Sequence, residues 1–300
     1  MEKGKIIAGV LAPHPPHLVY AENPKQNEPK SEGGWEILRW AYEKCRKNIL
    51  AKKPDVLIVH SPHWQTIVGH HVLGLEKFKG LSVDPIFPHL FRYEYDLTVD
   101  VDLSLKIAEK AKEKGLITKV MKNPNFRIDY GTITTLHLMN PDWNIPIISL
   151  SSNNSPYYFS NEVGQKQMMI LGQATKEAIE ESGKKAVLLA SNSLSHRHFV
   201  HEAEIPEDMS AEHVYNHSQY LWDMQVIKLM KEGKCQELLD ILSEFIDMSA
   251  AEVKAGALAW MLSALDIPKY PAEVHGYGNV IGTGNAVVEW DTEKSFANLI

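Results

Sequence analysis

The sequence predicts an α/β fold: a single domain over residues 1–300, in which helices flank a central mixed β-sheet. Short apolar runs alternate with longer runs of helical spacing, the pattern of strands and helices wound into one sheet. No Pro-, Ser- or Gly-rich linker separates two halves, and no internal repeat is present. In open α/β sheets, ligands gather beyond the carboxyl ends of the strands. We therefore expect the active site beyond those strand ends.

The first half of the chain begins with an apolar strand at 5–11 (KIIAGVL), followed by a helix at 35–52 that leads to a second strand at 54–60 (PDVLIVH). Strands are predicted at 70–75 and at 93–101, where apolar and polar residues alternate. Helical spacing follows at 103–114.

The second half begins with an apolar strand at 145–150 and an amphipathic helix at 161–182, which ends at Gly183 in the usual C-terminal position. A strand at 185–190 (KAVLLA) precedes an almost wholly helical stretch at 210–265 and a last strand at 286–290. Long loops in a compact domain are commonly lids or binding loops. We expect this of residues 20–34 and 200–209, which flank histidines.

The composition excludes several classes of function. The net charge of -7 and the pI near 6.1 argue against a nucleic-acid-binding protein, which normally needs a basic face. The two cysteines have no C-x-x-C spacing, which fits a reducing compartment. There is no signal-peptide pattern, and no apolar run approaches the roughly 18 residues of a membrane span. We expect a cytoplasmic enzyme with neither nucleic-acid nor membrane partners.

Three of the predicted strands each lead into a histidine. His14 and His63 are framed by prolines, and the strand at 185–190 leads to His196 and His198. Imidazole is the commonest ligand of catalytic metals, and the neighbouring prolines stiffen the backbone that carries it. The alternative is that the prolines only end strands and the histidines are ordinary loop residues. Together, in the same strand-end context, the histidines favour a metal site.

Two further histidines carry weaker signals. His17 lies close after His14, and His60 falls within its predicted strand. Side chains alternate between the faces of a strand, so His60 points away from Ser61 and is expected in the core.

Glu252 is the candidate carboxylate for such a site. Iron(II) oxygenases often use two histidines and one carboxylate on one face of the metal. Glu252 begins a predicted helix, and Ala255, Gly256 and Ala259 make that face small enough to lie against the core. The alternative is a capping box, in which the Glu252 side chain bonds back to the backbone amide of Ser249. The spacing alone leaves both interpretations open.

Tyr130 stands at the start of another predicted helix, directly after Asp129. Backbone amides are free at a helix N-terminus, and a tyrosine there can donate a hydrogen bond to a substrate or to oxygen. The alternative is that Asp129 simply caps the helix.

Several segments in the same order along nearly the whole chain resemble the class III extradiol dioxygenases, the family of the protocatechuate 4,5-dioxygenase catalytic subunit. The segments that carry the resemblance are IIAGVLAPHPPHLVY (6–20), LIVHSPHW (57–64), FRIDYGTITTLH (126–137), SSNNSPYY (151–158), LLASNSLSHRHF (188–199), AEVKAG (251–256) and VIGTGNAV (280–287).

The resemblance implies a non-haem iron(II) enzyme that inserts both atoms of dioxygen into an ortho-aminophenol or catechol. The family's iron ligands fall on His14, His63 and Glu252, and its catalytic base falls on His196. Many relatives carry Asp-His-Gly where this chain has Asp-Tyr-Gly around Tyr130. With tyrosine at this position the chain resembles the aminophenol-cleaving branch of the family. That resemblance implies 2-aminophenol as substrate and 2-aminomuconate 6-semialdehyde as product.

The same branch implies a partner, a paralogous α subunit that lacks the metal ligands, in an α2β2-like heteromer. This chain keeps the ligands and so resembles the catalytic member. Two alternatives remain: an extradiol dioxygenase for another catechol, such as a protocatechuate-like diol, and a zinc-dependent hydrolase on the same scaffold. Two imidazoles and a carboxylate also suit zinc, so the ligands alone do not decide the metal.

Overall fold

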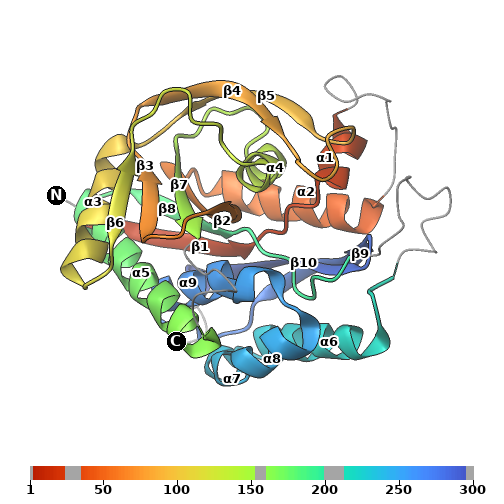
Figure 1. The fold of residues 1–300 in the computed structure, drawn as a ribbon. Coiled ribbons are helices and arrows are strands. Elements are labelled where there is room, and N and C mark those ends of the chain that lie inside the picture. Colours follow the sequence, from red (N-terminus) through yellow and green to blue (C-terminus); the bar gives the residue numbers. More distant parts are fainter. Residues whose placement is uncertain (1–2, 24–34, 153–159, 199–212, 295–300) are drawn as a thin grey trace.

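One large mixed β-sheet organises the molecule, described here by a computed structural model over residues 3–23, 35–152, 160–198 and 213–294. Within those residues, eight strands pair in the order β6-β3-β7-β2-β8-β1-β10-β9, and β4 and β5 form a separate antiparallel pair (Figure 1). The strands are β1 (Lys5–Leu11), β2 (Val56–Gln65), β3 (His70–Leu73), β4 (Lys77–Val83), β5 (Arg92–Thr98), β6 (Thr118–Met121), β7 (Ile147–Ser152), β8 (Lys185–Ala190), β9 (Glu273–Val280) and β10 (Thr283–Asp291).

The helices lie on both sides of this sheet. They are α1 (Pro16–Glu22), α2 (Glu36–Ala51), α3 (Val101–Glu113), α4 (Tyr130–Met139), α5 (Asn161–Ser182), α6 (His217–Lys231), α7 (Cys235–Asp240), α8 (Leu242–Ser249), the short 3-10 helix η2 (Glu252–Ala255) and α9 (Gly256–Ala264). No helix in the described part of the chain is long and apolar enough to cross a membrane.

The centre of the sheet is parallel and buried on both faces. Strands β7, β2, β8 and β1 run parallel, and β10 joins β1 antiparallel. Alternate side chains enter two separate cores: Ile58 and Leu188 pack with α3, α5 and α9, whereas Leu57 and Val187 pack with α2, α4 and β5. Two covered faces explain the nearly continuous apolar runs of these strands.

The predicted fold class is confirmed, and several elements match closely. The strands at 5–11 and 185–190 and the helix at 161–182 have the predicted bounds, and Gly183 takes the left-handed conformation that ends α5. The stretch from 213 to 265 is almost wholly helical, as expected. The parallel strands β1, β2 and β8 place their carboxyl ends at one edge of the sheet, where the histidines gather.

Some boundaries differ from the prediction. β2 does not end at His60 but continues to Gln65, and its pairing with β7 skips from His60 to Gln65. Residues 20–22 are helical, while 24–34 and 200–209 lie outside the described residues. β4, β6 and β9 were not predicted, because their apolar residues are too few and too interrupted by glycine and lysine to show a clear period.

Candidate metal centre

The first histidine of the site follows β1 directly. β1 ends at Leu11, and Pro13 and Pro15 frame His14 before α1 begins at Pro16. His14 is 3% exposed, and its Nδ1 lies 2.7 Å from the hydroxyl of Ser191. That contact fixes the ring and leaves its Nε2 for the centre of the site.

The second histidine lies in the irregular end of β2. The skipped pairing between His60 and Gln65 lifts residues 61–64 out of the ladder, and Pro62 has no amide hydrogen to offer it. His63 therefore turns toward the carboxyl edge of the sheet instead of into a regular strand position. Its backbone amide donates to the hydroxyl of Ser61 at 3.2 Å.

Glu252 occupies an unusual backbone segment, and the prediction that it opens a regular helix is wrong. It begins η2, in which Val253, Lys254 and Ala255 have positive φ angles of 40°, 55° and 51°. Each left-handed residue costs on the order of 1–3 kcal/mol. α9 begins only at Gly256. Such a segment persists only where the surrounding structure holds it.

The holding group is Asn192, in the segment that follows β8. Its Nδ2 donates to the carbonyl of Glu252 at 3.1 Å, and its Oδ1 accepts from the amides of Ala257 at 3.0 Å and Leu258 at 3.3 Å. Asn192 thus clamps both the strained turn and the start of α9. The amide of Ser193 donates to Oε2 of Glu252 at 2.6 Å and fixes the carboxylate itself.

The capping-box alternative for Glu252 is wrong. The hydroxyl of Ser249 donates to the carbonyl of Phe245, within its own helix. The Glu252 carboxylate instead points into the site, where its side chain is 1% exposed.

Three imidazole nitrogens converge on one oxygen of that carboxylate. Oε1 of Glu252 lies 3.0 Å from Nε2 of His14, 3.3 Å from Nε2 of His63 and 3.4 Å from Nε2 of His196. In spite of this proximity Oε1 is buried and accepts no hydrogen bond from the described residues. The rings crowd around the oxygen without aiming an N–H at it. A carboxylate oxygen in this position needs a cation, and the convergent nitrogens are suited to share one.

The electrostatics agree with this arrangement. Burial alone would raise the pKa of Glu252, but the imidazoles of His14 and His196 hold it well below its ordinary value. Glu252 is therefore ionised. Burial would lower the pKa of His63, but the close approach and negative charge of Glu252 raise it instead.

His196 is brought to the site by the segment after β8, as predicted. Its amide donates to the carbonyl of Ser249 at 3.2 Å, and it forms a bridge with Thr283 at the start of β10. Burial is the main reason that its pKa falls to about 4, against the opposing charge of Glu252. Its imidazole is therefore neutral at pH 7.

The structure confirms the helix cap at Asp129, and it also brings Tyr130 to the site. Asp129 caps α4 by accepting from the amide of Thr132 at 2.9 Å, and also accepts from Ser61 at 2.5 Å. Tyr130 itself reaches the site, where its hydroxyl lies 2.8 Å from Nε2 of His63. Burial raises its pKa well above the ordinary value, so the hydroxyl keeps its proton.

The other histidines separate into two groups. His17 and His198 line the same cavity as His14, His63 and His196. His60 does not: it is wholly buried in the core, with its ring centroid 5.5 Å from that of Trp260. The expectation that His60 is a core residue is confirmed.

The described residues around the site enclose a cavity of about 70 Å³. Its other lining includes Asp84, Ile86 and Phe87 from the segment after β4, none of which the sequence analysis singled out. The Asp84-Pro85 turn was the available signal, because Asp84 accepts from the amides of Ile86 and Phe87 to form it.

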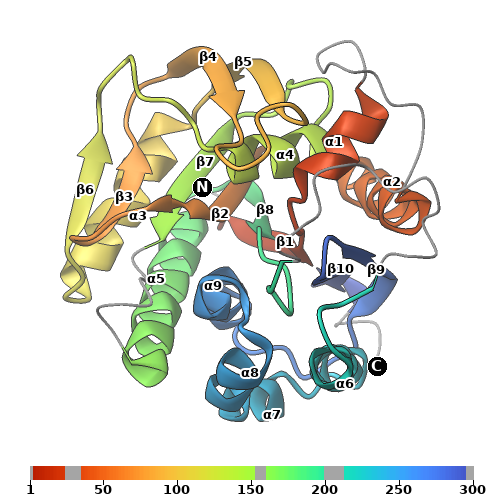
Figure 2. The same cartoon turned by 45° about the vertical axis from the view of Figure 1, so that its right-hand side comes forward.

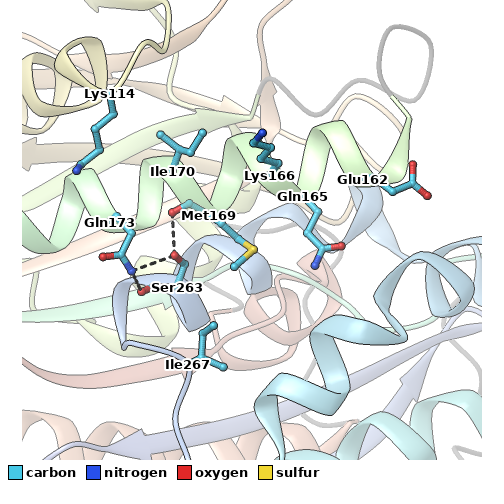
Figure 3. A pocket seen from close by; sticks show the side chains of 9 residues that line it. All are labelled: Lys114, Glu162, Gln165, Lys166, Met169, Ile170, Gln173, Ser263 and Ile267. Atoms are coloured by element: carbon cyan, nitrogen blue, oxygen red, sulfur yellow. Dashed lines mark hydrogen bonds between the residues drawn. The ribbon is translucent and has the colours of Figure 1, made fainter.

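A larger hollow of about 770 Å³ lies elsewhere, between α5 and α9 (Figure 3). Among the described residues, its lining includes Lys114, Lys166, Met169 and Ile170 but no histidine or cysteine. It therefore offers none of the chemistry found at the centre.

The donor set fits a divalent transition metal. Two imidazoles and one carboxylate on one side form the facial arrangement that non-haem iron(II) uses, and zinc accepts the same ligands. Ligand atoms of His14, His63 and Glu252 all lie within 4.8 Å of one another. The structure thus brings together every predicted site residue: His14, His63, Glu252, His196 and Tyr130.

Comparisons with known proteins identify similar sequences and folds. A family model described as the catalytic LigB subunit of aromatic ring-opening dioxygenase matches residues 8–289. The chain is 59% identical to the 2-aminophenol 1,6-dioxygenase beta subunit of Pseudomonas sp over 98% of this chain and 97% of that protein. It is 26% identical to the alpha subunit of the same name from Pseudomonas sp, over 85% of this chain and 91% of that one.

Two further proteins match the chain at lower sequence identity. 3,4-Dihydroxyphenylacetate 2,3-dioxygenase of Escherichia coli is 25% identical over 90% of this chain and 94% of its own length. An uncharacterized protein of Escherichia coli K12 has a similar solved structure, with a TM-score of 0.63, 17% identity, and coverage of 94% of this chain and 99% of that one. The last comparison supports the fold alone.

Proposed function

Because this chain belongs to the family of the catalytic LigB subunit of aromatic ring-opening dioxygenases, the class III extradiol enzymes, we propose that it opens the ring of 2-aminophenol. The bond broken joins the hydroxyl-bearing carbon to its neighbour on the side away from the amino group. Both atoms of dioxygen enter the product, 2-aminomuconate 6-semialdehyde. The 59% identity to the beta subunit, over nearly the whole of both chains, carries this assignment.

The relatives imply a metal cofactor, and we propose iron(II) held by His14, His63 and Glu252. The buried and unpartnered Oε1 of Glu252 supports a cation at this point. When bound, iron(II) supplies the one-electron chemistry that allows dioxygen to react with an aromatic ring, and open positions for both reactants. By holding the ion at one point of the cavity, these three residues would fix where both reactants meet, which lowers the entropic cost of their encounter.

His196 would accept the proton of the substrate hydroxyl at Nε2. With a pKa near 4 in the closed site, its imidazole is neutral and has a free lone pair at pH 7. Its Nε2 lies 3.4 Å from Oε1 of Glu252, so it faces the same point as the ligands. A positioned histidine contributes typically ~100- to 10,000-fold to such a step.

Tyr130 would donate its hydroxyl proton in a hydrogen bond to the ring substituent of the substrate. Its raised pKa keeps the hydroxyl protonated. The apolar side chains of Ile86 and Phe87 line the same cavity and offer an apolar surface to the aromatic ring.

We also propose that residues 1–300 form one catalytic domain that pairs with a paralogous α subunit. The support is that both the beta and the alpha subunits of a named heteromeric enzyme match this chain. A cytoplasmic location stays a prediction.

The test is oxygen uptake by purified chain reconstituted anaerobically with iron(II), with a zinc(II) sample as control. Uptake on adding 2-aminophenol with iron only, together with a new absorbing ring-opened product, supports the proposal. Uptake that requires an added α-like chain supports the heteromer as well. A clear preference for catechol or protocatechuate contradicts the substrate assignment, and hydrolysis by the zinc form without any uptake contradicts the reaction.

A further inference from the structure

Figure 2 shows α2 beside the edge hairpin of β9 and β10, against which it packs. A second cluster of metal-ligand side chains lies at this contact, apart from the centre. Ligand atoms of Cys45, His275 and Glu289 all lie within 4.8 Å of one another. Each comes from a different element, and none comes from an element that holds His14, His63 or Glu252. The proposed reaction uses none of these three residues.

The hairpin is irregular where His275 lies. Val274 pairs with Val288 and Gly276 pairs with Val287, so His275 is an extra residue in β9. Such a bulge re-aims side chains, and bulges are over-represented beside functional sites. Here the ring turns toward β10, and its Nε2 lies 2.8 Å from Oε2 of Glu289.

Gly276 allows α2 to approach closely. A Cβ at this position would lie 2.9 Å from Cβ of Ala41 and 3.2 Å from the carbonyl of Ile37. Because Cys45 is one helical turn beyond Ala41, the same close approach brings its thiol to the hairpin. Cys45 is fully buried and is not in a disulfide.

Glu289 is the most telling member of the cluster. Its side chain is 1% exposed, and Oε2 accepts from Nδ2 of Asn48 at 3.0 Å as well as facing His275. Oε1 is buried and has no hydrogen-bonding partner in the part of the chain that the structure describes. The lysine on the same helix, Lys52, instead bonds Asp291 and Glu293. An unpartnered buried carboxylate oxygen beside a thiol and an imidazole is a costly arrangement without a cation.

We propose that Cys45, His275 and Glu289 form a second, structural metal site for a divalent ion of the zinc type, which fastens α2 to the β9–β10 hairpin. Thiolate, imidazole and carboxylate are the ligands of zinc and cobalt(II), whereas magnesium and calcium require oxygen ligands throughout. The thiol of Cys45 gives up its proton to solvent when the ion binds. The side-chain amide of Asn48 stands beside the cluster and, after a flip, offers its oxygen as a fourth ligand.

The test uses cobalt(II), which shows a strong charge-transfer band in the near ultraviolet when a thiolate binds it. The double variant His14→Ala/His63→Ala removes the first centre and serves as the background. In that background we expect about one cobalt ion per chain by metal analysis after dialysis, with a thiolate-to-cobalt absorption band. Adding Cys45→Ser abolishes the band, and adding Cys235→Ser, the other buried thiol, leaves it unchanged.

A second readout covers the case in which Cys45→Ser fails to fold. His275→Gln keeps the thiol, and is expected to lower the cobalt affinity at least about tenfold. At the same concentration, zinc should raise the melting temperature of the background protein by more than that of His275→Gln. The proposal is overturned if the folded background protein binds no cobalt, or if its band depends on Cys235 and not on Cys45. Absence of cobalt binding is the result expected if His275 and Glu289 form only an ordinary buried hydrogen-bonded pair.

Discussion

Nε2 of His14 and Oε1 of Glu252 lie 3.0 Å apart in a buried site, yet no described residue donates a hydrogen bond to Oε1. This distance suits two ligand atoms that face the same cation, which would neutralise the carboxylate charge. The strained backbone after Glu252 and the clamp by Asn192 serve this relationship, because they hold the carboxylate where a regular helix would not.

Replacing Glu252 with Gln should abolish iron binding. The change removes the negative charge while keeping the size of the side chain, so the ion and the turnover that depends on it should both be lost. Iron content after gel filtration is the direct measurement. Glu244→Gln, on the exposed side of α8, is the matched control and should keep its iron. Full iron content in Glu252→Gln would contradict the ligand assignment.

Replacing Ser191 with Ala should weaken the metal site without removing a ligand. Ser191 lies between His14 and Thr135, at 2.7 Å and 2.8 Å, and so orients the ring of His14. Loss of a partner of this kind typically lowers metal affinity about 10- to 100-fold. A competition titration with a chelator measures it, with Ser243→Ala on α8 as control. Equal affinities for the two variants would show that Ser191 does not orient the ligand.

Replacing His196 with Ala should spare iron and stop turnover. The fall expected for a lost proton acceptor is about 100- to 10,000-fold in kcat. Iron content should remain that of the unsubstituted protein, since two other imidazoles and Glu252 still hold the ion. His89→Ala, at an exposed position after β4, controls for the loss of a histidine. An unchanged kcat in His196→Ala would show that His196 is not the catalytic base.

Much of the centre could be predicted because its residues follow strands with clear patterns. The apolar runs of β1 and β8 set where His14 and His196 emerge. The backbone at Glu252 could not be predicted, since its left-handed turn depends on Asn192, which is 60 residues away in the sequence. Spacing alone favoured a capping box there as much as a ligand.

The residues around the ligands escaped prediction for a related reason. Asp84 and Phe87 line the cavity from a segment after β4, a strand with no clear period. Only the packing of the β4–β5 pair over α4 brings that segment to the site. Ser193 contributes its backbone amide to Glu252, a role that its side-chain type does not reveal.

Tyr130→Phe should test the hydroxyl without disturbing the packing of the ring. The variant keeps the ring contact with His63, at a centroid distance of 4.2 Å, and removes the donor. We expect kcat/KM for 2-aminophenol to fall about tenfold, the effect of roughly 1.4 kcal/mol for one hydrogen bond. Tyr20→Phe on α1 is the matched control. An unchanged kcat/KM would remove Tyr130 from the substrate-binding groups.

Acid should destabilise the protein in part through His60, away from the centre. Burial, helped by the charge of His70, lowers the pKa of His60 from 6.5 to about 3. The unfolded chain therefore binds a proton between these two pH values that the folded chain does not. The free energy of unfolding should fall with decreasing pH across this window, by about 1.4 kcal/mol per pH unit from this residue.

His60→Leu should remove that contribution. Denaturant unfolding at several pH values between 6.5 and 4 should show a slope smaller by about 1.4 kcal/mol per pH unit than in the unsubstituted protein. His89→Gln, on an exposed residue, should leave the slope unchanged. Above pH 7 the imidazole is neutral in both states, so the pH dependence of the two proteins should agree there. Identical slopes in acid would show that His60 is protonated as readily in the folded chain as in the unfolded one.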